Sequence, residues 1–148
     1  MTNFEIVHTW NPNIDEFNED IDQIGEWQFL DQNTNNKRFL LTHPKLMDDG
    51  GLLFQYFYAP LRKIDACSDL IFQNTHDQFH HSIETDVEGN IWVPTHLFPQ
   101  SLPAEKVGRG SILKDGYLDV AIAKLSPDGV IIFEKSVSQI FIENGRFQ

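Results

Sequence analysis

The fold is decided by a stretch near the middle of the chain, Thr85-Asp86-Val87-Glu88-Gly89-Asn90-Ile91-Trp92-Val93. An acidic segment ending in Gly-Asn lies between runs of β-branched and aromatic residues, which is typical of a β-hairpin. We expect a strand over residues 82–86, a turn over 87–90 and a returning strand over 91–93. The histidines at positions 80 and 81 come directly before this hairpin.

The stretch has a copy in the first half of the chain, Leu46-Met47-Asp48-Asp49-Gly50-Gly51-Leu52-Leu53-Phe54, with Gly50 under Gly89 (89 − 50 = 39). Two further segments match with Phe72 under Phe133 (133 − 72 = 61). Because the offset grows by 61 − 39 = 22 residues, the second copy must carry an insertion. The Pro- and Gly-rich segment 97–116 has the composition of such a loop.

Each copy is predicted as four short antiparallel strands, which is the size of a β-propeller blade. We therefore expect an all-β chain of two blades in an incomplete ring, over about residues 37–75 and 76–137, followed by a C-terminal tail. Natural propellers have about four to eight blades. The chain is then a fragment of a longer propeller, or it assembles with copies of itself, a trimer supplying six blades. A compact β-sandwich is the remaining interpretation.

Residues 1–36 are predicted to form a strand and one amphipathic helix. The strand covers Phe4 to Trp10, and Asn11-Pro12-Asn13 ends it. The helix has Asn13 as its cap and Gly25 at its end. Its apolar stripe consists of Ile14, Phe17, Ile21 and Ile24.

Charge and composition exclude several classes of protein. Lys and Arg number 11 against 22 Asp and Glu, a net charge of −11, which argues against nucleic acid and anionic membrane as partners. No window reaches the ~20 apolar residues of a membrane-spanning helix, and the first residues lack the pattern of a secretion signal. We expect a soluble, acidic, cytoplasmic chain. A single cysteine, Cys67, excludes an internal disulfide.

The motif Phe79-His80-His81-Ser82, followed by Glu88-Gly89-Asn90-Ile91-Trp92-Val93 and later by Leu125-Ser126-Pro127-Asp128-Gly129, resembles the bacterial arylsulfotransferase family. The resemblance covers about residues 42–143. It implies a six-bladed propeller that moves a sulfuryl group between phenolic sulfate esters and phenols through a sulfated histidine. Members of the family are often exported to the periplasm, and their sulfated histidine lies in a later blade.

Histidines are the candidate site residues. In a propeller, the segment that leads into the innermost strand of a blade lies at the mouth of the channel. With the offset of 39 residues, His80 and His81 align with Leu41 and Thr42, so the repeat does not itself require histidine at these positions. We expect His81 and His80 as catalytic residues, with His81 contacting sulfate and His80 held by polar neighbours, although the reverse assignment is also open. Candidates for substrate binding are His76, His96 and Arg109.

The implied partner is a small aryl sulfate or phenol, and we expect no cofactor. His76 and His80 have the i, i+4 spacing of metal ligands on a helix, but the flanking sequence indicates a loop and strand, so we expect no metal site. Two other functions stay open. The chain is a non-catalytic module that binds a small anion or assembles through exposed blade faces, or it is a truncated chain without independent activity.

Overall fold

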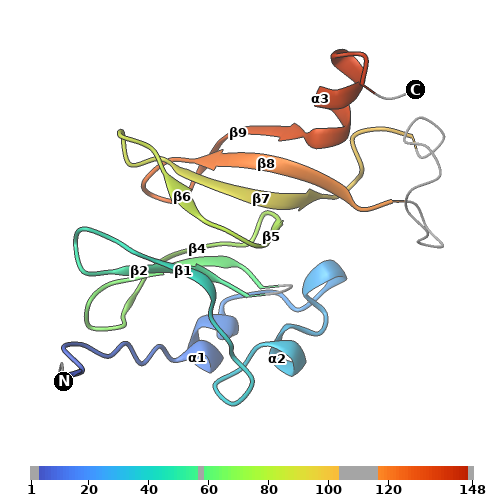
Figure 1. Cartoon of the computed structure of the whole chain (residues 1–148). Coiled ribbons are helices and arrows are strands. Elements are labelled where there is room, and N and C mark those ends of the chain that lie inside the picture. The colour runs from blue at the N-terminus through green and yellow to red at the C-terminus, as the bar shows by residue number, and fades with distance from the viewer. Residues whose placement is uncertain (1–3, 57–58, 104–116, 147–148) are drawn as a thin grey trace.

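The computed structural model describes residues 4–56, 59–103 and 117–146 and contains two antiparallel sheets (Figure 1). The strands of the first sheet, in spatial order, are β1 (Thr42–Leu46), β2 (Leu52–Gln55), β3 (Leu61–Ile64) and β4 (Leu70–Asn74). The second sheet contains β5 (Gln78–Phe79), β6 (Glu84–Thr85), β7 (Ile91–Leu97), β8 (Asp119–Leu125) and β9 (Ile131–Ser136), in the order β5-β7-β8-β9 with β6 also paired to β7. The predicted antiparallel β architecture is thus confirmed.

The internal repeat is visible in the strand register. In the first hairpins the equivalent pairs are Lys45 with Leu53 and Glu84 with Trp92, 39 residues apart. In the last hairpins they are Lys63 with Phe72 and Lys124 with Phe133, 61 residues apart. Both last hairpins also shift register directly after the lysine. The insertion falls where it was expected, in the connection between β7 and β8, of which residues 104–116 lie outside the described chain.

The turns that join β1 to β2, β3 to β4, β6 to β7 and β8 to β9 share one hydrogen-bond pattern. In the β6–β7 turn, Asp86 N–H donates to the Asn90 carbonyl and Gly89 N–H donates to the Asp86 carbonyl, each at 3.0 Å. The residue in the position of Gly89 has a positive φ in every turn, between 77° and 82°. This is a type I turn closed by a residue in the left-handed region, where glycine costs least.

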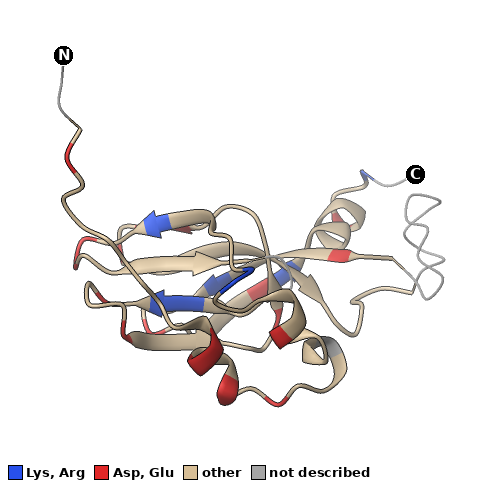
Figure 2. Cartoon of the chain, turned by 90° about the horizontal axis from the view of Figure 1, so that it is seen from below, with Lys and Arg blue, Asp and Glu red and all other residues tan. Residues whose placement is uncertain are grey.

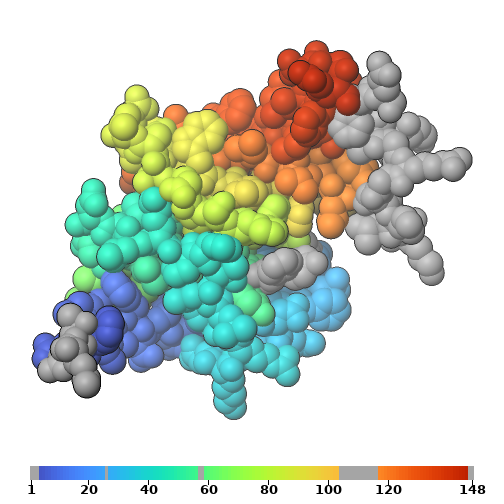
Figure 3. Space-filling model, in the orientation of Figure 1, coloured from blue at the N-terminus to red at the C-terminus, as the bar shows by residue number. Residues whose placement is uncertain are grey.

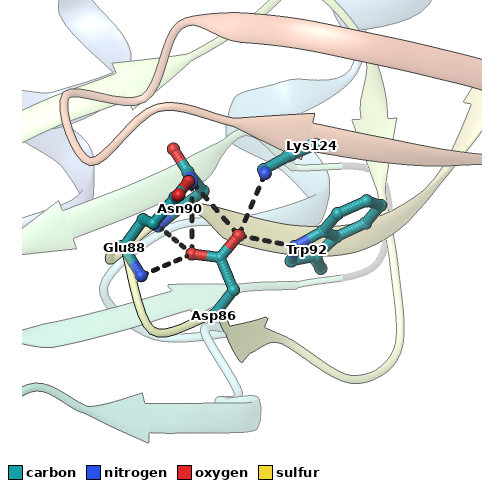
Figure 4. A network of polar contacts seen from close by, with 5 residues as sticks. All are labelled: Asp86, Glu88, Asn90, Trp92 and Lys124. Atoms are coloured by element: carbon teal, nitrogen blue, oxygen red, sulfur yellow. Dashed lines mark hydrogen bonds and ion pairs between the residues drawn. The ribbon is translucent and has the colours of Figure 1, made fainter.

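Asp86 anchors the β6–β7 turn through its side chain (Figure 4). Its Oδ1 accepts from the backbone N–H groups of Glu88 and Asn90, and its Oδ2 accepts from Trp92 Nε1 at 3.2 Å and lies 3.0 Å from Lys124 Nζ. Partial desolvation raises the pKa of Asp86, but the hydrogen bonds from Lys124, Asn90 and Trp92 outweigh it and lower the pKa well below its ordinary value. The carboxylate therefore ties the turn to β8.

The main core lies between the two sheets, which Figure 3 shows packed in contact. Leu53 and Leu61 come from the first sheet, and the second sheet with its inner segment supplies Phe79, Ile83, Ile91, Val93, Ala123 and Leu125. Alternation in β2 directs Leu53 and Gln55 to this core and Leu52 and Phe54 to the opposite face, which is why all four β2 residues are buried.

The N-terminal segment covers the outer face of the first sheet (Figure 1). It contains α1 (Ile14–Glu19), the 3-10 turn η1 (Gly25–Trp27) and α2 (Leu30–Asn33). Its apolar side chains form two clusters, one of Ile14 and Phe17 against Leu52, Phe54 and Ile64, the other of Ile21, Trp27 and Leu30 against Ala59. Asn13 caps α1 as predicted, by accepting from Glu16 N–H.

Two predictions for this segment are wrong. Residues 4–10 form no strand, because Trp10 instead packs on the first sheet and donates its indole N–H to the Gly50 carbonyl at 3.2 Å. The helix ends at Glu19 instead of continuing to Gly25, since the chain turns so that Ile21 and Trp27 can reach a second apolar cluster. A further helix, α3 (Val137–Glu143), follows β9.

Arg62 lies fully buried between the N-terminal segment and the first sheet. Its Nη2 donates to Asn18 Oδ1 at 2.6 Å and its Nε to Gln73 Oε1 at 3.1 Å, while its guanidinium lies 5.8 Å from the centre of the Phe17 ring. Desolvation lowers its pKa to about 10. A buried charge held by amides and an aromatic face links the cover to the sheet.

In the part of the chain that the structure describes, the outer face of the second sheet is less covered, with only α3 beside β8 and β9. Val120, Ile122 and Phe133 are between 36% and 45% exposed on this face. Figure 2 shows acidic residues on the N-terminal helices and in turns, with Lys and Arg mainly on strands. Within the described ranges, no helix is long and apolar enough to cross a bilayer.

Candidate functional site

The histidine pair interrupts the first edge of the second sheet, between β5 and β6. The sequence predicted one strand over residues 82–86 that follows the histidines, but two short strands, β5 and β6, lie on either side of the pair and both pair with β7. Between the pairs Phe79–Thr95 and Glu84–Trp92, the inner segment advances five residues while β7 advances three. The histidines therefore lie in a bulge, a feature common near functional sites.

A histidine with positive φ lies at the first edge of each sheet, in β1 and between β5 and β6. His81 has φ 62°, and His43, in the irregular part of β1, has φ 48°. In the first sheet the bulge is one residue shorter, since three steps from Thr42 to Lys45 match two on β2. The sequence repeat placed His80 and His81 over Leu41 and Thr42, but the shorter bulge shifts this match by one residue. His81 is therefore equivalent to His43, so the repeat does contain a second histidine at this position. Its backbone conformation, which histidine tolerates better than most residues, explains part of this recurrence.

His80, His81 and His96 are brought together. His80 Nδ1 and His81 Nδ1 lie 2.6 Å apart with their rings nearly perpendicular, and the ring of His80 lies 4.2 Å from that of His96, centre to centre, with 33° between the planes. His80 is 7% exposed, His96 is half-buried and His81 is exposed. The backbone N–H of His80 donates to the Pro94 carbonyl at 3.0 Å. The pair from the bulge thus meets a histidine from β7.

The environment keeps two of these histidines neutral at pH 7. Desolvation, followed by the nearby His96 and His81 rings, lowers the pKa of His80 to about 4. Desolvation and the proximity of His81 also lower the pKa of His96. Neutral imidazoles are nucleophiles, proton acceptors or single hydrogen-bond donors, according to which nitrogen carries the proton.

The contact between His80 and His81 requires one proton between the two Nδ1 atoms. His80 Nε2 is buried with no hydrogen-bond partner within the described residues. A buried N–H without an acceptor is rarer than an unsatisfied acceptor, so we assign the shared proton to His80 Nδ1. His81 Nδ1 then accepts, so the N–H proton of the His81 ring lies on Nε2.

The other predicted site residues fall outside this cluster. The His76 side chain is exposed in the connection between the sheets, with its backbone N–H bonded to Asn74 Oδ1 at 2.9 Å, and no ring contact of the described chain joins it to the three histidines. Arg109 lies in residues 104–116, outside the described chain.

Two features near the site had no clear signal in the sequence. Gln55 at the end of β2 donates its side-chain N–H to the His81 carbonyl at 2.7 Å, and only its position two residues after Leu53 indicates the inward face. Asp77 is 5% exposed, and its carboxyl group interacts with that of Glu134 on β9. Desolvation and this contact raise the pKa of Glu134 to about 8, so the pair holds a proton at pH 7. Nothing local relates residues so far apart in the chain.

In the part of the chain that the structure describes, no group of three or more His, Cys, Asp or Glu residues is arranged to hold a metal ion. His80 Nδ1 and His81 Nδ1 are as close as two atoms that share one proton. Two nitrogens that bind the same metal ion would lie farther apart.

Comparison with known proteins gives one match. The family model described as arylsulfotransferase (ASST) matches residues 43–147, which include both sheets and all three clustered histidines. Neither the curated proteins nor the solved structures contain a match. Since the family model covers more than half of the chain, the chain belongs to the arylsulfotransferase family.

Proposed function

We propose that this chain contributes a histidine-lined edge to a site for sulfuryl transfer between phenolic sulfate esters and phenols. The observation that carries the proposal is the cluster of His80, His81 and His96, with a neutral buried histidine bonded to an exposed one, in a member of the arylsulfotransferase family. The transfer chemistry itself comes from family membership.

We also propose that the two sheets are neighbouring propeller blades. Each sheet follows the chain order of its hairpins, and the chain passes from the last strand of the first sheet to the first strand of the second. Blades have this arrangement, whereas most β-sandwiches exchange strands between their sheets. In a blade the inner strand lines the channel, so β1 and the β5–β6 segment would present His43 and His81 there.

In the proposed reaction, a bond forms between sulfur and a nucleophilic nitrogen while the bond from sulfur to the aryl oxygen breaks, and the departing oxygen takes up a proton. The acceptor phenol then reverses these steps. The His81 Nε2–H is suited to donate to a sulfonate oxygen or to the departing aryl oxygen. His80 would position His81 through the shared proton, and His96 would pack against His80. We assign no nucleophile within the described residues.

The alternative function, a non-catalytic site for a small anion, makes a different prediction about pH. A charge-based anion site needs an imidazolium, and His80 would be protonated only near pH 4. Sulfate binding that grows steeply as the pH falls below 6, without turnover, would favour this alternative. Binding of an aryl sulfate at pH 7 would favour the transfer site.

The test uses 4-nitrophenyl sulfate as the donor and phenol as the acceptor at pH 7. Binding is measured by calorimetry, and acceptor-dependent release of 4-nitrophenolate is measured by absorbance. We expect His81→Ala to weaken binding by about tenfold or more, the size of one hydrogen bond to a charged group. His76→Ala is the control, because it removes an exposed histidine that lies outside the cluster, and it should bind like the unchanged chain.

Two results would contradict the proposal. One is a chain that binds no aryl sulfate at pH 7. The other is binding or transfer that survives the double replacement of His80 and His81.

A further inference from the structure

The histidine pair is held from both sheets at once. The backbone N–H of His80 donates to the Pro94 carbonyl of β7, within its own sheet. The carbonyl of His81 accepts from Gln55 Nε2 of β2, in the other sheet, at 2.7 Å. Gln55 is 1% exposed and pairs with Thr42 beside the bulge of β1, so its amide connects the bulges of the two inner strands.

The backbone of His81 needs such support. A non-glycine residue in the left-handed region is strained and persists where its surroundings over-determine it. The hydrogen bond from Gln55 fixes the peptide plane that follows His81, and therefore the direction of its Cα–Cβ bond. The same direction places His81 Nδ1 within 2.6 Å of His80 Nδ1.

We propose that Gln55 is a positioning residue, whose side-chain amide holds His81 in the conformation that shares a proton with His80. The inference rests on the proposed function only in giving the pair a role in sulfuryl transfer. Without the amide donor, His81 is free to return to negative φ, and its ring then leaves His80. Gln55 itself acts through the backbone of His81, by donating to its carbonyl.

Gln73 provides a matched control. It is a half-buried glutamine on β4 whose Nε2 also donates to a backbone carbonyl, that of Phe17, at 3.0 Å. That carbonyl belongs to α1, on the outer face of the first sheet and on the opposite side from the histidines. Gln73→Leu removes this bond and also the acceptor of Arg62 Nε, so it should lower stability without changing the histidine pair.

The test compares Gln55→Leu and Gln73→Leu with the unchanged chain by NMR of the histidine ring nitrogens and their protons. We expect Gln55→Leu to lose the strongly downfield proton shared by the pair and to raise the His80 midpoint above about 4, because His81 no longer lies beside it. Burial and His96 still act on His80, so its midpoint should stay below the ordinary histidine value. Gln73→Leu should keep both signatures. If Gln55→Leu does not fold, Gln55→Asn replaces it, since its amide is one methylene too short to reach His81.

Retention of the shared proton and of the His80 midpoint in the Gln55 variant would overturn the inference. Equal changes in both glutamine variants would also overturn it, because they would show general loosening. The spectra need no substrate, so failure of the positioning role is separable from failure of aryl sulfate binding. A chain that binds no aryl sulfate but loses the shared proton in Gln55→Leu would refute only the proposed function.

Discussion

The backbone of Gly129 lies directly against the ring of Phe72. A Cβ atom at position 129 would come within 2.5 Å of two ring carbons, closer than real Cβ atoms approach other heavy atoms. Gly129 belongs to the β8–β9 turn and Phe72 to β4, so this contact joins the outer hairpins of the two sheets. The Gly129 carbonyl also accepts from Asn74 Nδ2 at 2.7 Å.

Replacement of this glycine should therefore cost more than the backbone alone requires. Gly89→Ala is the matched control, since Gly89 has nearly the same φ, 81° against 82°, and its added Cβ would meet Pro127 at an ordinary 3.6 Å. We expect Gly89→Ala to lower the free energy of unfolding by about 1 kcal/mol and Gly129→Ala by a further ~1–3 kcal/mol. Urea denaturation at pH 7 measures both. Equal losses of unfolding free energy in the two variants would show that the Phe72 ring can move aside without cost.

The carboxyl pair of Asp77 and Glu134 makes stability depend on pH. The pKa of Glu134 is about 8 in the folded chain and near 4.5 when unfolded, so the folded state holds the extra proton between these values. Its contribution is complete below pH 4.5 and is lost as the pH rises through 8. We expect Glu134→Gln to flatten this part of the profile, as measured by denaturation between pH 5 and 9. The control Glu19→Gln, an exposed residue at the end of α1, should leave the slope unchanged.

His80 should titrate far below an ordinary histidine. Because its folded pKa is about 4 against 6.5, the unfolded chain binds more protons between these values, and stability should fall as the pH drops from 6.5 to 4. NMR titration of the ring measures the midpoint directly. His80→Gln should reduce this slope and leave the smaller part that comes from His96, whereas His76→Gln, at an exposed position, should keep the whole slope. A His80 midpoint above 6 would contradict the burial of its ring.

A comparison of Asp86 with Asp65 separates two roles of an acidic turn residue: accepting backbone hydrogen bonds within the turn, and bonding side chains outside it. Both accept backbone N–H groups of their own turn, but Asp86 also bonds Asn90, Trp92 and Lys124. We expect Asp86→Ala to destabilise the chain more than Asp65→Ala at pH 7, as measured by thermal unfolding. The stabilisation from ionised Asp86 is progressively lost as the pH falls below about 3.8. The difference in melting temperature between the two variants should therefore be smaller at pH 3 than at pH 7. If this difference in melting temperature were the same at pH 3 as at pH 7, the charge of Asp86 would not contribute to its contacts with Asn90, Trp92 and Lys124.

Closure of a six-bladed ring from three copies is not expected. Such a ring needs the outer face of the first sheet to receive the second sheet of a neighbour, but Ile14 and Phe17 of the N-terminal segment already pack there. Light scattering should therefore give no trimer at any concentration. A trimer would show that this cover can leave the sheet.

Much of the fold was predictable from local sequence. The acidic-Gly turns and the offsets of 39 and 61 residues predicted the hairpins and their register, because a turn type fixes which residues face each other. The predicted strand over residues 4–10 failed for a different reason. Of its apolar residues, Trp10 packs on the sheet, whereas Phe4, Ile6 and Val7 are exposed, and a pattern in one sequence does not distinguish this arrangement from a strand.

The candidate site was predictable only in part. Sequence alone indicated His80, His81 and His96 as candidates, through the motif at the start of the inner strand and the position of His96 after the hairpin. The sequence did not indicate the bulge. The bulge arises because β5 and β6 both pair with β7, and the segment between them has more residues than the matching part of β7. Arg109 stays untested, since it lies outside the described residues.

The sequence by itself determined the repeating hairpins, their turns and the existence of a histidine-rich segment, because each depends on residues close together in the chain. Only the tertiary structure decided that His80 is buried against His96, that Gln55 reaches across the sheets to His81, and that Asp77 meets Glu134. These contacts join residues from different strands, and their pKa values and conformations follow from desolvation and packing that no local pattern encodes.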